Sequence, residues 1–221
     1  MNSKETNPAV VVRPPRIDDI PALTDLHLAC FGPDEHVPVL LGRDYIKASY
    51  QWLLNDEDCY SLVADLDGRI IGVVGVCDGP YTLSMFMACL PEMGRSFLRS
   101  PGLALEKRLW RRLTRQSADT EVSRKLAAEQ EIAQVTIIAV DGANRGMGIF
   151  PALVDAVQAR SRERGSRAIQ SGVYKFNQPS RKAFTKVGWS ETPELETNDT
   201  VFFLHYIDPQ LPRELGIRPA A

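Results

Sequence analysis

Two glycines preceded by an arginine stand where an apolar strand gives way to a helix. Segment 134–140, QVTIIAV, is almost continuously apolar, and the loop DGANRGMG follows it. A helix is expected over 149–164, so its first N–H groups and the positive end of its dipole lie at this loop. Gly146 and Gly148 let the main chain approach an anion closely, and Arg145 adds a charged donor. The pattern predicts a site for a phosphate or pyrophosphate group.

The two glycines are also compatible with a tight turn between strand and helix, which would need no ligand. A Rossmann dinucleotide site would need a third small residue, but Phe150 and Pro151 stand there. A Walker loop would need Gly-Lys followed by Ser or Thr, which this loop lacks. Pro151 has no N–H group, so an anion would have to use main-chain amides between Arg145 and Phe150.

A second motif lies downstream, at the start of a helix expected over 177–187. It reads Asn-x2-Ser-x3-Phe-x3-Gly-Trp from 177 to 189, and the first motif reads Val-x4-Arg-Gly-x-Gly-Ile from 140 to 149. With the strand expected between them at 168–174, these motifs resemble the coenzyme A motifs of the GCN5-related N-acetyltransferase (GNAT) family. The specific similarity covers 140–189, and the earlier elements match the family in order only.

The resemblance implies a fold and an activity. The fold is α/β of the α+β type: a mixed, mostly antiparallel sheet that is splayed between strands 4 and 5 and flanked by helices. The activity is transfer of the acetyl group of acetyl-CoA to a primary amine, by direct attack in a ternary complex and without a metal. A non-catalytic acyl-CoA-binding module and an acyltransferase for longer acyl chains are the alternatives.

The resemblance also implies which residues hold the coenzyme. The strand over 136–140 would leave its neighbour and pair with the pantetheine arm, chiefly through Ile138 and Val140. The following loop would hold the pyrophosphate, Asn177 would contact the coenzyme arm, and Phe184 would lie beside the thioester. The full expected set is Ile138, Ala139, Val140, Arg145, Gly146, Met147, Gly148, Ile149, Phe150, Asn177, Ser180 and Phe184.

The catalytic groups are less clearly marked. Phe184 stands where many members of the family carry a tyrosine that protonates the departing thiolate. Either the thiolate leaves unassisted, or water, Tyr174 or Ser180 supplies the proton; a thiol of pKa ~8.5 is a tolerable leaving group near neutrality. Glu129 and Glu131, just before the apolar strand, and Asp141, just after it, are candidate bases acting through water. A solvated charge at the end of a strand is the more common role for such a residue.

The remaining elements complete a single domain. We expect a disordered tail over 1–9, one domain over 10–208 with a coenzyme-binding core at 134–189, and a C-terminal tail over 209–221. Asp18 or Asp19 would cap a first helix, and Asp67-Gly68 predicts a hairpin. The expected strands are 10–13, 60–64, 69–76, 134–140, 168–174 and 200–206, with a second helix over 44–54.

Segment 78–130 has no strand pattern and is expected to be a helical insertion of short stretches followed by a longer basic helix. Its basic residues could grip the 3′-phosphate of the coenzyme or an acidic acceptor, or form a solvated helix face: Lys107, Arg108, Arg111, Arg112 and Arg115. Its apolar residues could hold a longer acyl chain or face the core: Leu83, Met85, Phe86, Met87 and Leu90. Asp34, Glu35 and His36 form a loop that could hold a cationic amine.

Composition excludes several classes of protein. The chain has 221 residues and a formal net charge of −2, which gives no overall field to attract nucleic acid or anionic lipid. No apolar run is long enough to span a bilayer, and the N-terminus lacks the apolar segment of a secretory signal. Cys30, Cys59, Cys77 and Cys89 are scattered, which predicts reduced thiols in a cytoplasmic protein. The expected partner is a small-molecule or peptide amine, and a homodimer remains open.

Overall fold

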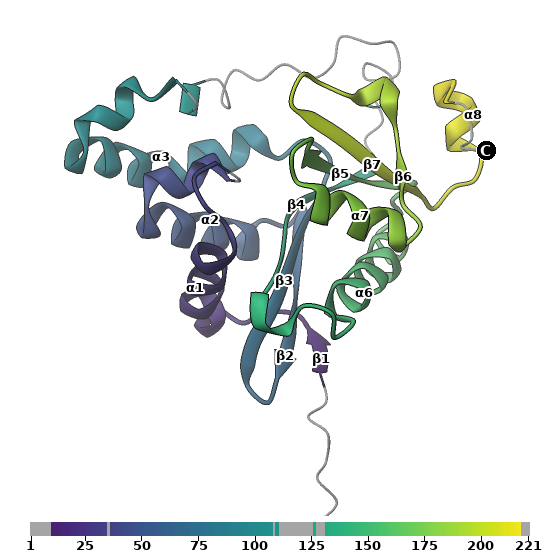
Figure 1. The fold of residues 1–221 in the computed structure, drawn as a ribbon, viewed down its shortest axis with the longest axis horizontal. Helices are drawn as coiled ribbons and strands as arrows, with labels where there is room; N and C mark the ends of the chain where they lie inside the picture. Colours follow the sequence, from purple (N-terminus) through teal and green to yellow (C-terminus); the bar gives the residue numbers. More distant parts are fainter. Residues whose placement is uncertain (1–9, 35, 108, 111–125, 127–130, 218–221) are drawn as a thin grey trace, which may run out of the picture.

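A seven-stranded sheet runs through the molecule (Figure 1). The structure is a computed structural model that describes residues 10–34, 36–107, 109–110, 126 and 131–217. The strand order is β1-β2-β3-β4-β5-β7-β6, and β4 and β5 form a parallel pair in an otherwise antiparallel sheet. The strands are β1 (Val10–Arg13), β2 (Cys59–Leu66), β3 (Arg69–Asp78), β4 (Ile132–Val140), β5 (Ala168–Tyr174), β6 (Ser190–Glu191) and β7 (Thr200–Tyr206). This is the mixed, mostly antiparallel sheet that the sequence predicts.

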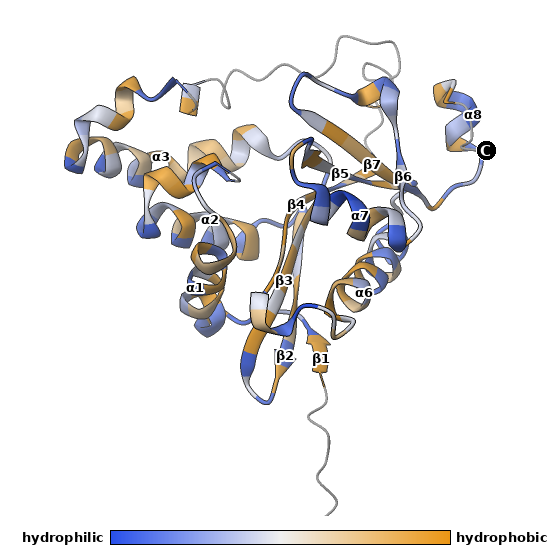
Figure 2. Cartoon of the chain, in the orientation of Figure 1, coloured by the Kyte–Doolittle hydropathy of each residue, from blue (hydrophilic) through white to orange (hydrophobic). Residues whose placement is uncertain are grey.

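Helices cover both faces of the sheet (Figure 1). On one face α1 (Ile20–Cys30), α2 (Arg43–Asn55) and α3 (Thr82–Arg99) share a core with β2 and β3. On the other, α6 (Ile149–Glu163) and α7 (Gln178–Lys186) pack with the opposite side chains of the same strands. Apolar residues colour the strands and the inward helix faces, whereas the outward face of α7 is hydrophilic (Figure 2). Successive side chains of each strand point to opposite faces of the sheet, so the same strands contribute to both hydrophobic cores.

Local sequence signals fix where the helices begin and end. Pro21 lies in the first turn of α1, where its missing N–H costs nothing. The Asn177 side chain caps α7 by accepting a hydrogen bond from the Ser180 amide at 3.1 Å. Gly165 follows α6 with φ +86°, a conformation that glycine adopts without a Cβ penalty. Asp19 precedes α1, but its carboxylate contacts Arg13 and the Arg16 amide instead of capping that helix.

The insertion between β3 and β4 differs in detail from the expectation. One continuous 18-residue helix, α3, replaces the expected short stretches, with Pro91 inside it. Its hydrophobic side chains divide: Met85 and Phe86 pack against the core, whereas Leu83, Met87 and Leu90 are exposed. A 3-10 turn over Pro101–Leu105 follows. Several residues named in the sequence predictions lie outside the described residues: Glu35, Arg108, Arg111, Arg112, Arg115 and Glu129.

The segment after Asp208, expected to be a tail, contains the short helix α8 (Leu211–Leu215). Leu211, Leu215 and Ile217 are buried in a third apolar cluster that includes Leu204 of β7. The two-residue strand β6 is also absent from the sequence prediction, because two residues are too short to show a period of two. None of the described helices is long and apolar enough to cross a membrane.

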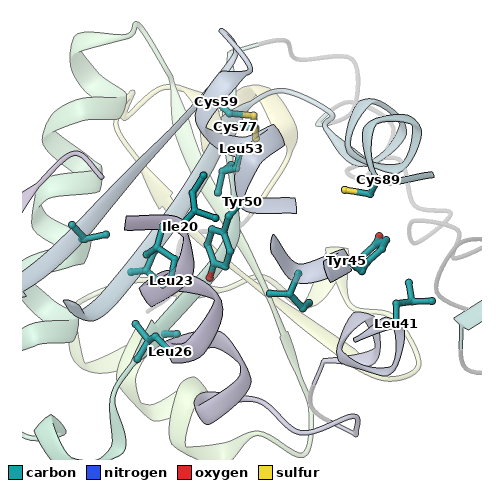
Figure 3. Close-up of a cluster of buried hydrophobic side chains, with 14 of the residues drawn as sticks. Ile20, Leu23, Leu26, Leu41, Tyr45, Tyr50, Leu53, Cys59, Cys77 and Cys89 are labelled. Atoms are coloured by element: carbon teal, nitrogen blue, oxygen red, sulfur yellow. A yellow bond between two sulfur atoms is a disulfide. The ribbon is translucent and has the colours of Figure 1, made fainter. Parts of the chain in front are cut away.

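The prediction of four reduced cysteines is wrong for two of them. Cys59 and Cys77 form a disulfide between β2 and β3 (Figure 3). They are directly opposite each other in the antiparallel register, with Cα atoms 4.0 Å apart. Cys30 and Cys89 are thiols that take no part in a disulfide. The two cysteines of the disulfide are 18 positions apart in the sequence, so only the strand register reveals that they meet.

Candidate active site

The strands β4 and β5 part halfway along their length. They pair only over Ile132–Val135 and Ala168–Ser171, so β4 continues from Thr136 to Val140 without β5 beside it. A cavity of about 480 Å³ opens at this gap. Residues 134–138 and 170–174 line it, together with side chains of α1, α2 and α3 on one face of the sheet and of α7 on the other. A ligand in the cavity could therefore reach both faces through the gap.

The open edge of β4 presents main-chain groups at alternate residues. The Asp141 amide donates to Ile71 O of β3 at 2.8 Å. Because main-chain groups alternate sides along a strand, Ala139 also faces β3, whereas Ile138 and Val140 direct their N–H and C=O groups toward the gap. The Cys30 thiol reaches Val140 O at 3.5 Å, in agreement with this orientation. Ile138 and Val140 are the two residues that the sequence marks for contacts along this edge.

A bulge at Thr136 marks the point where the strands part. Gly75 of β3 pairs with Ile137 and Val76 pairs with Val135, so Thr136 is left without a partner in the register. Its Oγ1 is buried and makes no hydrogen bond within the described part of the chain. Buried hydroxyls are normally satisfied, so this atom has capacity for a ligand or a water in the cavity that it lines.

The glycine loop between β4 and α6 lies at the wide end of the gap. Gly146 has φ +85°, and Gly148, the N-cap of α6, has φ +78°. A Cβ at either glycine would meet no atom within 4 Å, so the space in front of both is open. The first amides of α6 have no partner within that helix. Ile149 and Phe150 pack their side chains into the core, which leaves their amides as the groups that can bind an anion.

On the α7 side, Phe184 belongs to a closed aromatic cluster. The side chain is 1% exposed, and its ring lies 5.1–5.4 Å from those of Phe150, Trp189 and Phe203. Tyr174 stacks on Phe176 at 5.3 Å and lines the cavity with Asn177, Ser180 and Phe184. Of these side chains, Tyr174 and Ser180 carry hydroxyl groups, and Phe184 offers no proton.

Two of the carboxylates predicted as bases do not line the cavity. Asp141 pairs with Arg69 at 3.0 Å, accepts from Asn144 Nδ2 at 2.7 Å and caps the turn Gly142–Asn144. Glu131 is exposed and precedes β4, at the end where β4 and β5 are still paired. The structure therefore brings Tyr174 to the cavity but neither carboxylate. Within the described ranges, no cluster of three potential metal ligands occurs.

Sequence reasoning missed a histidine pair in the cavity wall. His27 Nε2 lies 2.9 Å from His36 Nδ1, and His27 Nδ1 lies 3.2 Å from the Tyr50 hydroxyl. His27 is 3% exposed on α1, and Tyr50 lies on α2 among Ile20, Leu23 and other core side chains (Figure 3). The available signal was His27 itself, because it is the titratable residue in the apolar stripe of its helix. Its partners come from a loop and a second helix, which only the tertiary fold identifies.

The burial of His27 makes the free energy of unfolding depend on pH. Desolvation lowers its pKa from 6.5 to about 4, so it stays neutral in the folded chain while the unfolded chain takes up a proton. The contribution of neutral His27 to the free energy of unfolding is fully present above pH 6.5. It is lost as the pH falls toward 4, at about 1.36 kcal/mol per pH unit and about 3 kcal/mol in total. We expect His27→Gln to remove that slope in urea titrations at pH 4.5–7.5. Parallel curves for the two proteins would contradict the assignment.

Comparison with known proteins agrees with this geometry. The family model described as "Acetyltransferase (GNAT) family" matches residues 20–189. The solved GNAT domain of S. lividans PAT is 18% identical, with 93% of this chain and 100% of that chain covered and a TM-score of 0.57. The ribosomal-protein-S18-alanine N-acetyltransferase of Escherichia coli is 11% identical, with 90% and 95% covered and a TM-score of 0.53.

A third structure, yncA of Salmonella typhimurium with its cofactor acetyl-CoA, is 15% identical, with 91% and 95% covered and a TM-score of 0.52. Because these sequence identities are low, the three similarities show the fold alone. A search of curated protein sequences finds no match. The family model covers most of the chain, and the sheet parts where that fold requires. The chain belongs to the acetyltransferase (GNAT) family.

Proposed function

We propose that the chain transfers the acetyl group of acetyl-CoA to a primary amine within the cavity between β4 and β5. One observation carries the proposal: β4 loses β5 as a partner at Thr136, and its unpaired stretch leads into an open glycine loop at the start of a helix. The gap offers unpaired main-chain groups for an amide-bearing arm, and the loop offers amides for a diphosphate. The two lie in succession along the chain, as a long ligand with both features requires.

The residues present suit acetyl-CoA. The amides from Gly146 to Phe150 and the Arg145 guanidinium would hold the diphosphate. Ile138 and Val140 would exchange main-chain hydrogen bonds with the pantetheine arm, and Asn177 and Ser180 would border it from α7. Bound there, acetyl-CoA supplies the activated acyl group.

The chain's own part in the reaction is positioning and polarisation. An N–H group on the open edge of β4 would stabilise the negative charge that develops on the carbonyl oxygen. The aromatic cluster around Phe184 excludes water from one side of the reacting centre. Tyr174 or Ser180 would offer a proton to the departing thiolate, although a thiol of pKa ~8.5 needs little help near neutrality.

Two alternatives are each favoured by one observation. The buried Phe184 supplies no acid, which favours a module that binds acyl-CoA without turnover. Met85 and Phe86 in the cavity wall favour a longer acyl group.

A thiol-release assay with acetyl-, succinyl- and long-chain acyl-CoA over a broad amine panel separates these functions. Acetyltransfer predicts amine-dependent thiol release that is fastest with acetyl-CoA. Coenzyme binding without thiol release from any amine would identify a binding module, and fastest release from a long-chain donor would identify the third activity.

A further inference from the structure

Two glutamines stand side by side in the wall of the cavity. Gln134 of β4 and Gln170 of β5 are direct partners in the parallel register, one position before the last pair of the two strands. Neighbouring strands are about 4.8 Å apart, and directly paired residues point to the same face of the sheet. Both side chains line the cavity. The two carboxamides are therefore adjacent where the strands are still joined, just before the gap begins.

The strand register also shows which face of the sheet carries the glutamine pair. Gln134 is directly opposite Cys77 of β3, and Cys77 belongs to the core that β3 shares with α1, α2 and α3. Gln170 points to the same face because it is the direct partner of Gln134. The two carboxamides therefore face the part of the cavity that α1, α2 and α3 cover, whereas α7 borders the cavity from the other face.

The hydrogen-bonding groups of the glutamine pair are open to the cavity. Neither carboxamide has a hydrogen-bond partner in the described part of the chain. Neither is among the polar atoms that the fold buries without a partner, so both reach the space of the cavity that they line. Each carboxamide has an oxygen that accepts and an NH2 group that donates. Because polar groups inside a protein are normally paired, this pair is suited to a ligand that both donates and accepts.

We propose that the glutamine pair binds an amide group of the acceptor, and that the acceptor is a primary amine whose apolar body carries this amide. The proposal rests on the acetyltransferase function given above. An amide can satisfy one carboxamide through its oxygen and the other through its N–H group. The rings of Tyr45, Trp52 and Tyr81 contribute to the same wall of the cavity and would pack against the apolar body.

The position of the glutamine pair sets the distance between the amide and the reacting nitrogen. The coenzyme arm is proposed to run along Ile138 and Val140, so its acetyl group lies toward the closed end of the gap at Thr136. Gln134 is two residues before Thr136, or about 7 Å along the strand. An extended chain advances about 3.5 Å for every three bonds, so about six bonds separate the amide carbon from the nitrogen. The compound 6-aminohexanamide has this length.

Steady-state kinetics with acetyl-CoA and matched amines test the substrate class. The probes are 6-aminohexanamide, its apolar isostere 6-methylheptylamine and its carboxylate counterpart 6-aminohexanoate. We expect kcat/KM for the amide to exceed that for each of the other two by at least about 10-fold, because they leave hydrogen-bonding groups of the pair unmatched. Equal or faster turnover of either counterpart, or of amines without an amide in a broad panel, would overturn the inference while supporting acetyltransfer. No turnover of any amine, with acetyl-CoA bound, would overturn the proposed function itself.

Leucine variants test the two residues. Gln134→Leu and Gln170→Leu keep the approximate size of the side chain and remove its hydrogen-bonding groups. Each is expected to reduce the preference for 6-aminohexanamide over 6-methylheptylamine to about threefold or less, through a lower kcat/KM for the amide. The matched control is Gln51→Leu, on the exposed side of α2 and outside this cavity, which should retain the wild-type preference. An unchanged preference in a folded variant of either residue of the pair, or a raised KM for acetyl-CoA in its place, would overturn the assignment.

Discussion

Replacement of Gly148 by valine is expected to weaken acetyl-CoA binding by at least about 100-fold, or about 2.8 kcal/mol. Gly148 has φ +78° at the N-cap of α6, and nothing lies within 4 Å of the position where a Cβ would stand. Gly148 directly precedes the first amides of α6, where the diphosphate is proposed to bind. A β-branched side chain would add bulk at this loop and would pull the main chain away from its left-handed conformation. Isothermal titration calorimetry with acetyl-CoA measures the loss.

The matched control is Gly165→Val, at the other end of the same helix. Gly165 has a similar φ of +86° and equally open surroundings, so this variant suffers comparable backbone strain without touching the glycine loop. Each variant should lose about 1–3 kcal/mol of stability. Only Gly148→Val should lose the coenzyme. Equal affinities in the two variants would show that the loop does not bind the diphosphate.

Replacement of Gly75 by alanine should be the most damaging single-methyl change in the sheet. A Cβ at Gly75 would stand 2.5 Å from Leu53 Cδ2 and 2.7 Å from Thr136 Oγ1, closer than real Cβ atoms approach other atoms. Leu53 is buried, and Thr136 is the bulge residue where β4 leaves β5, so neither can move freely. We expect a loss of about 2–3 kcal/mol in the free energy of unfolding, together with weaker acetyl-CoA binding.

Gly94→Ala provides the opposite case. Gly94 lies inside α3, has no atom within 4 Å of its built Cβ and has no positive φ. Alanine there should raise the free energy of unfolding by about 0.5–1 kcal/mol through helix propensity. Urea denaturation of both variants gives the comparison. If Gly75→Ala were as stable as the wild type, the close packing of β3 against the bulge would be incorrect.

The sequence predicted most elements because local signals and periodicity agree there. The bounds of β1, β5 and β7 match the prediction, and the start of α6 follows from the glycine loop. The expected parting of β4 and β5 at Thr136 came from the family motifs, because nothing local to that strand signals a lost partner. Asp19 shows the limit of local reasoning: its carboxylate has a stronger partner in Arg13, and the Arg16 amide also competes for it.

Long-range pairings escaped prediction. The Cys59–Cys77 disulfide depends on the register of β2 against β3, and the positions of the cysteines in the sequence do not predict that register. The histidine pair depends on where the loop after α1 folds back on its own helix. Glu131 and Asp141 were attractive because they flank the central strand, yet they lie at its ends, whereas the cavity opens beside its middle. The motif spacing predicts a coenzyme side of the cavity, whereas it gives no prediction for the acceptor side.

The central claim is that one continuous surface, from the glycine loop to the open edge of β4, holds acetyl-CoA. A crystal structure of the chain with acetyl-CoA tests it most directly. We expect the diphosphate at the amides of residues 146–150, the pantetheine arm along Ile138 and Val140, and the acetyl group in the cavity between β4 and β5. A coenzyme bound elsewhere, or a glycine loop that closes onto protein atoms while the coenzyme is bound, would contradict the account.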